Sequence, residues 1–496
     1  MVEYNQKILT KIHARGGGHI LRDIGFISED EKMKRYMLWL WVFVIILLGG
    51  CTFGMRQDKD GDGTAALTDT RKYTTLLVSL KDPPAGLTPA KGDGTDETAA
   101  IQAIFDYAVE NQKIILIPAN AIFVVDGLLI RGKRNFSILG YGTLKHKKGG
   151  SEAILKISEC SGFSVRILHT DGNVKENYSI EGKVNQNLHS LAIYNSHDFK
   201  VGSLYDINPA GDSLCMNNVA NASIESIDAK ADEPSGRNAL SITKAQYITI
   251  NSVVSDNVGY RGMPGGIALE PNYKEDHIQN ILIRSAVIRS GAENGLAVTN
   301  KTSAVVKDIE INAQITKFNP SESQAFKLNN IENFKGNVKV YQEGADLCTG
   351  ASITGCKNVN ADLEIYNSIV GLGIGKDSFN LYLTGKIIGA QEAGLVMWEG
   401  VSDCTIDMEI KQTGLDGRNG RVKVTDRVEN VEFKGDYSYD GTGSYCFWLA
   451  GMIINSHADH LDAGGWAVNN LVTGPSAADL SIDRVTASRK EVSQAP

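Results

Sequence analysis

Residues 211–280 gather acidic, basic and phenolic side chains of the kinds that react with sugar chains. Two carboxylates about 6.5–9.5 Å apart can hydrolyse a glycosidic bond. Alternatively, a base can remove the proton next to a uronate carboxylate while a cation neutralises that carboxylate. The candidate catalytic residues are Asp212, Arg237, Tyr260, Arg261 and Glu270, and the candidate substrate-binding residues are Lys244, Asp256, Asn272 and Lys327.

These residues belong to a chain that repeats a short strand pattern. Polar, often Asn-containing turns precede alternating apolar residues, as in NFSIL at 135, QYITI at 246 and NVNADLEI at 358. Two interleaved strand series with one period, and without helical patterns between them, predict an all-β parallel β-helix. The last apolar residues of the second series lie 21–30 residues apart: Met216, Ile242, Leu269, Val298, Leu328, Ile353, Ile374 and Met397.

The repeat places the candidate residues on the outside of the coils and leaves their role open. Successive coils are about 4.8 Å apart, so Asp212 and Glu270, two coils apart, are separated by about 10 Å, which is marginal for hydrolysis. Proton removal from a uronate would instead rely on the basic and phenolic candidates. Such a row can also bind sugar without reacting, and a structural ion pair between Arg237 and Glu270 is equally compatible with the sequence.

The stretch KGDGTDETAAIQ, residues 91–102, is a glycine turn followed by an amphipathic helix. Ile101, Ile104, Phe105 and Ala108 fall on one helical face, and Thr95 or Asp96 can cap its first turn. A β-helix exposes the end of its core, so we expect this helix to cover that end. A phosphate site at the turn is the weaker alternative, because no Walker lysine follows.

The segment GDGTDETAAIQAIFDYA, then KIILIPANAIFVV and GYGTL at 140–144, resembles the N-terminal capping motif of the pectate-lyase-like right-handed β-helix superfamily. The resemblance implies a right-handed parallel β-helix over residues 88–455 with an N-terminal capping helix. It also implies a protein that acts on polysaccharide as a lyase, glycoside hydrolase or epimerase. GRNALSI and GGIALEPN resemble the pattern GRQxISI…GIDIEPN of bacterial and phage β-helix proteins, with Ala268 in place of an acidic residue.

The net charge of the chain limits the classes of ligand that we expect it to bind. The net charge of -8 argues against nucleic acid, since phosphate binding needs a basic face. The partner that the resemblance implies is polysaccharide, and the alternative function is a non-catalytic carbohydrate-binding, adhesion or structural protein. No organic cofactor is expected. Trp398 and Trp448 can stack on sugar rings, although packing is the favoured role for both.

The N-terminal region has the residue pattern of an export signal. Basic residues precede the apolar run 37–48, and Leu48-Gly-Gly-Cys51 follows it. This order predicts a signal peptide over 33–50, and its end resembles the bacterial lipobox, which implies lipidation of Cys51. We therefore expect a lipid-anchored protein of the bacterial cell envelope, sorted to the outer membrane by Thr52; an inner-membrane anchor is the alternative. Residues 1–32 are expected to be a spurious or cleaved extension.

Residues 51–87 are predicted to form a polar tether, and residues 456–496 a C-terminal cap and tail. Within the tether, Asp58, Asp60, Asp62 and Asp69 match calcium-loop positions, with Gly63 at the sharp turn. A solvated acidic tether is the favoured alternative to a calcium site. The six cysteines after Cys51 show no metal-ligand spacing, and we expect most to be buried thiols, with Cys348 and Cys356 as a candidate pair.

Overall fold

The computed structural model describes the part of the chain that carries the strand repeat. The described residues are 76–177, 186–259, 265–290, 294–318, 323–344, 347–413, 420–435, 445–449, 453–458, 461–462, 471–473, 480–482 and 485–486. The signal sequence, Cys51, the calcium candidates Asp58, Asp60, Asp62 and Asp69, and the site candidates Tyr260 and Arg261 lie outside these ranges.

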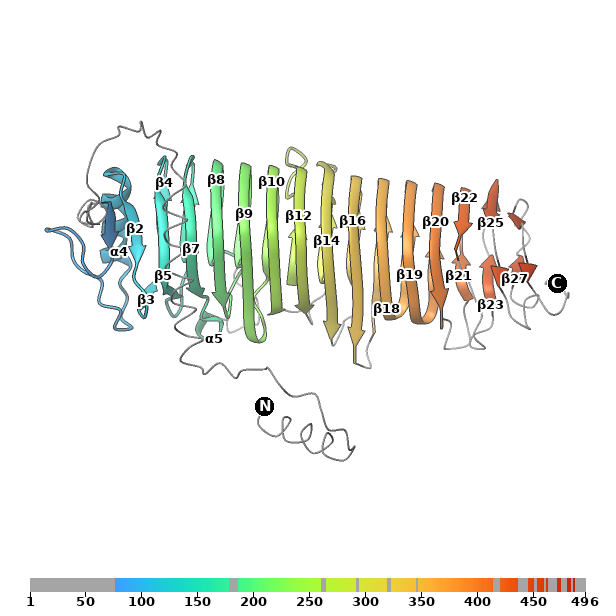
Figure 1. Ribbon diagram of the computed structural model, residues 1–496, viewed down its shortest axis with the longest axis horizontal. Helices are drawn as coiled ribbons and strands as arrows, with labels where there is room; N and C mark the ends of the chain where they lie inside the picture. Colours follow the sequence, from blue (N-terminus) through green and yellow to red (C-terminus); the bar gives the residue numbers. More distant parts are fainter. Residues whose placement is uncertain are drawn as a thin grey trace, which may run out of the picture. The chain divides into compact units, whose positions relative to one another are not determined.

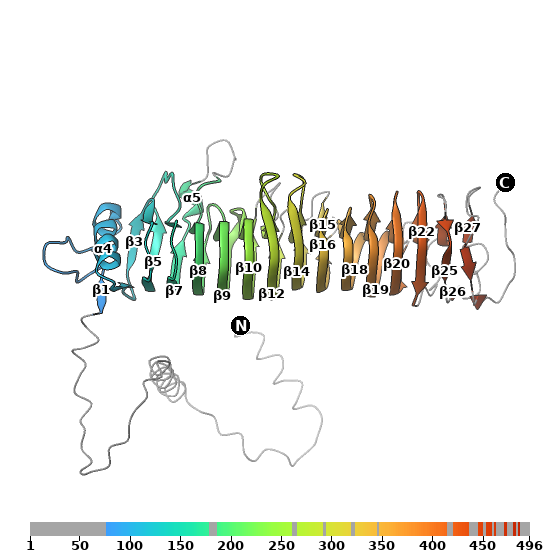
Figure 2. The same ribbon diagram turned by 90° about the horizontal axis from the view of Figure 1, so that it is seen from above.

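The described chain is a parallel β-helix in which each strand pairs with the equivalent strands one coil before and one coil after it (Figures 1 and 2). Long strands turn a corner and serve two faces of the coil. In β10 (Asn238–Val258), residues 238–242 pair with β11 (Gly265–Leu269), whereas residues 245–256 pair with β12 (His277–Ser290). We name the two faces after β11 and β12.

The β11 face carries most of the predicted site residues. It consists of β4 (Leu128–Arg131), β6 (Leu155–Ser158), the first parts of β8 (Leu191–Ile207), β9 (Leu214–Ser235) and β10, then β11, β13 (Leu296–Thr299), β15 (Gln324–Asn329), β17 (Thr349–Thr354), the last parts of β18 (Lys357–Gly375) and β19 (Phe379–Met397), β21 (Gly420–Val424), β23 (Tyr445–Leu449) and β27 (Leu471–Thr473).

The β12 face holds the longer strand segments. It consists of β2 (Ile114–Ile117), β5 (Ser137–His146), β7 (Ser164–Asp171), the later parts of β8, β9 and β10, then β12, β14 (Val305–Phe318), β16 (Glu332–Glu343), the first parts of β18 and β19, β20 (Val401–Lys411) and β22 (Val428–Lys434). The remaining elements are β1 (Leu77–Ser79), β3 (Ile122–Val125), β24 (Ile453–Ile454), β25 (Ser456–Ala458), β26 (Leu461–Asp462), β28 (Leu480–Ile482), β29 (Val485–Thr486), α4 (Thr98–Glu110) and α5 (Val174–Asn177).

The core follows the predicted alternation of inward and outward side chains. The eight apolar residues that ended the second strand series are all fully buried. Leu269 is among them, so its neighbour Glu270 points away from the core, as expected. Aromatic rings also stack from coil to coil: Phe136, Phe163 and Phe199 have successive ring centroids 5.0 and 4.9 Å apart.

The turns that lead into the β12 face form a second kind of stack. Asp308, Asn333, Asn358 and Asn380 occupy equivalent positions on successive coils with φ of 55–57°. This left-handed conformation favours Asn and Asp among residues with a side chain. The Asn-containing turns read from the sequence are therefore the sharp bends of the coil.

The expected helix is α4, which lies at the N-terminal end of the strand stack (Figure 1). Ile101, Ile104, Phe105 and Ala108 are buried in the same core cluster as the first strands. The first-turn N–H of Thr98 donates to Asp96 Oδ1 at 3.1 Å. Protection of the core end by α4 remains a prediction. The sheet itself begins with β1, inside the segment expected to be tether.

Two further expectations concern cysteines and membranes. The described cysteines Cys160, Cys215, Cys348, Cys356 and Cys404 are all buried free thiols, so the candidate pair Cys348–Cys356 is not bonded. Within the described ranges, no helix has the length and apolar character needed to cross a bilayer.

Candidate active site

The candidate site forms where the β8 and β9 coils stack on the β11 face. His189 and Asp212 stand two residues before the paired core residues Leu191 and Leu214, so they occupy equivalent positions on neighbouring coils. Cys215 faces outward, because Leu214 before it and Met216 after it are buried in the core. One donor atom each from His189, Asp212 and Cys215 lies within 4.8 Å of the other two, and all three residues are buried.

Asp212 is a fully buried carboxylate with one engaged oxygen. Its Oδ1 accepts hydrogen bonds from Asn238 Nδ2 at 2.8 Å and from the Asn238 N–H at 3.2 Å. Its Oδ2 lies 3.2 Å from His189 Nδ1 and 3.8 Å from an Arg237 amino nitrogen, without a hydrogen-bond partner among the described residues. Burial raises the pKa of Asp212, but His189 and Arg237 outweigh it and hold the pKa below its ordinary value. Asp212 is therefore charged.

His189 is held in its protonated form. Burial lowers its pKa, but the negative charges of Cys215 and Asp212 outweigh this effect and raise the pKa to about 10. The Asp212 N–H and Oδ2 both lie close to Nδ1, at 3.3 and 3.2 Å. A protonated Nδ1 can only donate, so the contact with Oδ2 is the attractive one. The His189 ring nitrogen and the Cys215 sulfur lie within 4.8 Å of each other.

Tyr194 and Arg237 bring the cluster to the surface. The Tyr194 hydroxyl donates to Cys215 Sγ at 3.7 Å. Burial first, and then the negative charge of Cys215, raise the pKa of Tyr194, so the phenol keeps its proton at neutral pH. The Arg237 side chain is 19% exposed, and its Nε has no hydrogen-bond partner among the described residues. We call His189, Tyr194, Asp212, Cys215 and Arg237 the Cys215 cluster.

The cluster already contains cationic side chains where a metal ion would bind. His189, Asp212 and Cys215 offer nitrogen, oxygen and sulfur donors at metal-ligand separation. However, the Arg237 guanidinium lies 3.8 Å from Asp212 Oδ2, so a cation already sits beside the free carboxylate oxygen. Together with the His189 imidazolium, it offsets the Asp212 carboxylate and would repel a second cation.

Of the predicted catalytic residues, the structure brings Asp212 and Arg237 together and places Glu270 apart. Glu270 lies 3.0 Å from Lys301 Nζ, and its side chain is 38% exposed. The alternative of an ion pair between Arg237 and Glu270 is therefore not realised: Arg237 lies next to Asp212 of the preceding coil, and Glu270 pairs with Lys301. The Lys301 ammonium comes from the turn after β13.

The predicted substrate-binding residues are spread over two places. Lys244 lies 3.7 Å from Asp276, whose other carboxylate oxygen accepts the backbone N–H of Asn272 at 3.0 Å. Asp256 lies 3.7 Å from Arg289 on the β12 side of the coil. Lys327 faces outward on the β11 face, two pairings beyond Ala268. None of these residues contacts the Cys215 cluster among the contacts of the described chain.

Three cluster residues, His189, Tyr194 and Cys215, were missed from the sequence. A usable signal existed: NLHSLAIYN aligns with the next repeat so that His189 matches Asp212, and Ala192 matches Cys215. Cys215 itself stands between two inward residues, which makes it an outward cysteine. Because most cysteines were interpreted as buried apolar residues, Cys215 was not considered as a site residue.

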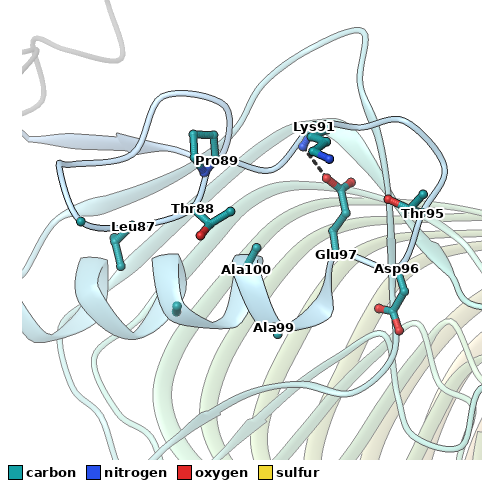
Figure 3. A pocket seen from close by; sticks show the side chains of 11 residues that line it. Leu87, Thr88, Pro89, Lys91, Thr95, Asp96, Glu97, Ala99 and Ala100 are labelled. Carbon is teal, nitrogen blue, oxygen red and sulfur yellow. Dashed lines mark hydrogen bonds between the residues drawn. The ribbon is translucent and has the colours of Figure 1, made fainter.

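The glycine turn at residues 91–94 is not a phosphate site. Gly92 and Gly94 adopt φ of 68° and 86°, a left-handed conformation that glycine enters without a steric penalty. The Glu97 carboxylate accepts the N–H of Lys91 and, at 3.0–3.1 Å, the N–H of Gly92 (Figure 3). The chain's own anion therefore occupies the donors that a phosphate would need, and the turn is structural, as expected.

Comparisons with known proteins concern the fold. No family model matches the chain, and no curated protein matches it. Gene product 12 of bacteriophage phi29 is similar at 14% identity and a TM-score of 0.49, over 76% of this chain and 62% of that one. An exopolygalacturonase from Thermotoga maritima is similar at 12% identity and a TM-score of 0.36, over 72% and 91%. The A-module of the Azotobacter vinelandii mannuronan C-5 epimerase AlgE4 is similar at 13% identity and 0.43, over 79% and 97%.

Proposed function

We propose that the chain acts on an acidic polysaccharide by moving a proton next to a uronate carboxylate, as a lyase or an epimerase. The observation that carries the proposal is the convergence of a guanidinium, a phenol and a thiol–imidazolium pair in the Cys215 cluster. These groups supply the three things this chemistry needs: a cation for the carboxylate, a base for the proton and an acid to return it.

Each group has a role set by its position. Arg237, half-buried with an unpaired Nε, binds the uronate carboxylate and stabilises the charge that develops on it. Cys215, beside the His189 ring, acts as the base that takes the C5 proton. In a lyase, the C4–O4 bond breaks, a C4–C5 double bond forms and O4 takes the Tyr194 proton. In an epimerase, C5 takes a proton from solvent on the opposite face, because Tyr194, 3.7 Å from Cys215, lies on the same side as the base.

The geometry favours this chemistry over two-carboxylate hydrolysis. A hydrolase needs one carboxyl group that donates a proton and a second that activates water. Asp212 is fully buried, with Oδ1 engaged by Asn238, and it orients His189. Glu270 lies apart from Asp212 and is paired with Lys301 at 3.0 Å.

A panel of uronate polymers in deuterated water tests the proposal with the full-length protein. Both reactions remove the C5 proton; elimination adds an unsaturated-uronate absorbance, and epimerisation places solvent deuterium at C5. We expect Cys215→Ser to lower kcat by about 10²-fold or more, because an alcohol is a far weaker base than a thiolate. Cys404→Ser, at another buried free cysteine, is the matched control.

Arg237→Ala should raise KM in a salt-dependent manner, and the exposed Arg284→Ala on the β12 strand should not. Full activity in Cys215→Ser would remove the cluster from the reaction. If no polymer reacts but salt-dependent binding is lost in Arg237→Ala, the alternative of a non-catalytic carbohydrate-binding protein holds instead.

We further propose that the protein is exported and anchored to the bacterial envelope through a lipid on Cys51. The order of basic residues, apolar run and Leu-Gly-Gly-Cys supports this location. Labelling with a fatty acid should mark the wild-type protein and leave Cys51→Ala unmarked. A labelled Cys51→Ala variant would contradict the anchor without affecting the proposed reaction.

A further inference from the structure

Trp398 lies on the outside of the β11 face, on a shelf made by two glycines. It follows the last residue of β19, and its N–H donates to the Ile374 carbonyl at 2.8 Å. A Cβ on Gly373 would lie 2.5 Å from Trp398 Cζ3, and a Cβ on Gly375 would lie 3.0 Å from Trp398 Cβ. The indole therefore rests where these two residues of β18 lack side chains.

The indole is not core packing. Trp398 is 41% exposed, which is unusual for so large an apolar side chain and corrects the favoured expectation from the sequence. An indole that lies against backbone on one side, with much of its surface in solvent, is the arrangement that stacks on the apolar face of a sugar ring.

Gly373 stands in the same outward row as Cys215. Six successive pairings connect them, through Ser241, Ala268, Ala297, Lys327 and Ser352. Cys215, Ser241, Ala268 and Ala297 are 5–6% exposed, whereas Lys327 and Ser352 are partly exposed, so the accessible part of the row is its end next to Trp398. At about 4.8 Å per coil the two ends of the row are about 29 Å apart.

Two observations along this row point to an anionic, hydroxyl-rich ligand. Lys327 is the only charged member between Cys215 and Gly373, so the row itself carries a positive charge and no negative one. Ser352, the next member after Lys327, is partly exposed and adds a hydroxyl that can hydrogen-bond to a sugar.

We propose that Trp398 and Lys327 form a distal subsite for the same acidic polysaccharide, with Trp398 stacking on a ring and Lys327 pairing with a uronate carboxylate. The inference rests on the proposed function, because it takes the polymer to extend along the β11 face from the Cys215 cluster. It adds that the protein selects long chains over short ones.

Chain-length dependence tests the subsite. Trp398→Ala should raise KM and Kd for the polymer by about five- to tenfold, with kcat unchanged and with no effect on a uronate trisaccharide. Trp398→Tyr should retain most of the polymer affinity, because a phenol ring still stacks. Tyr382→Ala removes an exposed aromatic residue from the β12 face and should behave as wild type.

The outcomes separate this inference from the proposed function. If wild-type protein modifies the polymer and Trp398→Ala has the same KM for it, the subsite is wrong and the reaction stands. Equal losses on polymer and trisaccharide would also overturn it, because they indicate a general defect. If wild-type protein neither binds nor modifies any uronate polymer, the proposed function fails and the subsite with it.

Discussion

Two polar rows run along the coils, and they are built in opposite ways. In the turn row of the β12 face, Asn333 Nδ2 donates to Asp308 Oδ1 at 2.8 Å, Asn358 to Asn333 at 2.9 Å and Asn380 to Asn358 at 2.7 Å. The row of His189 and Asp212 on the β11 face also stacks coil on coil. There, Asp212 Oδ2 remains without a hydrogen bond among the described residues although the residue is 1% exposed.

The difference separates stability from function. In the turn row, each amide serves the coil before it and the coil after it, so every coil adds a nearest-neighbour interaction. In the Cys215 cluster, the pKa of His189 is shifted, and Asp212 Oδ2 and Arg237 Nε have no hydrogen bond among the described residues. Buried polar atoms without partners cost stability, and perturbed groups of this kind are typical of sites that bind or react.

The largest effect is expected in the pH dependence of unfolding, which tests the ionisation of the Cys215 cluster. His189 has a folded-state pKa raised to about 10 from 6.5, so the folded protein retains a proton that the unfolded chain releases. The stabilisation of the folded state by this proton is complete below pH 6.5 and is lost as the pH rises toward 10. We expect the unfolding free energy to fall by on the order of a few kcal/mol across this window.

Denaturant titrations of wild-type protein and His189→Gln at several pH values supply the measurement. The variant should lose most of the slope above pH 7.5. Burial raises the pKa of Asp206 to about 7. The stability that the Asp206 proton contributes is therefore lost between pH 3.8 and 7, before the pH range in which the His189 effect is measured. Equal slopes in both proteins would show that the cluster does not hold a protonated imidazole.

Much of the fold could be predicted from the sequence, because a solenoid repeats one local rule. Alternation identified inward residues such as Leu269 and Met216, and Asn-containing turns marked the left-handed bends. The amphipathic pattern at residues 98–110 corresponds to α4. Each of these signals depends on neighbouring residues in one coil, so the spacing alone was sufficient.

The site was harder to predict, because it depends on contacts between coils. The repeat identifies the coils on which Arg237 and Glu270 lie. It does not give the direction in which either long side chain extends, and this direction decides the ion-pair partner. The partner of Glu270, Lys301, lies in a turn, where the period gives no register. His189 lies in an unusually long repeat: Ser164 pairs with Lys200, 36 residues later, whereas Lys200 pairs with Ser223, 23 residues later. This irregular spacing hides the equivalence of His189 and Asp212.

The smallest effect is expected where the turn row itself is interrupted. Tyr247 occupies the row position between Asn221 and Asn280, with φ of 58° and a side chain that is 56% exposed. A bulky residue pays a strain of about 1 kcal/mol in this conformation, which Asn largely avoids. Tyr247→Asn should also extend the ladder, because Asn221 Nδ2 already donates to Asp198 Oδ1 at 3.0 Å and its carbonyl oxygen can accept from the next coil.

We therefore expect Tyr247→Asn to raise the unfolding free energy by about 1 kcal/mol, measured as a higher denaturant midpoint at an unchanged slope. Tyr382→Asn is the matched control, because Tyr382 is 48% exposed and does not have a positive φ. That variant removes the same phenol without relieving strain, and it should gain nothing. The contrary result is a Tyr247→Asn variant that is no more stable than wild type while Tyr382→Asn is neutral. It would show that relief of backbone strain and side-chain hydrogen bonds in the turn row do not stabilise the protein coil by coil.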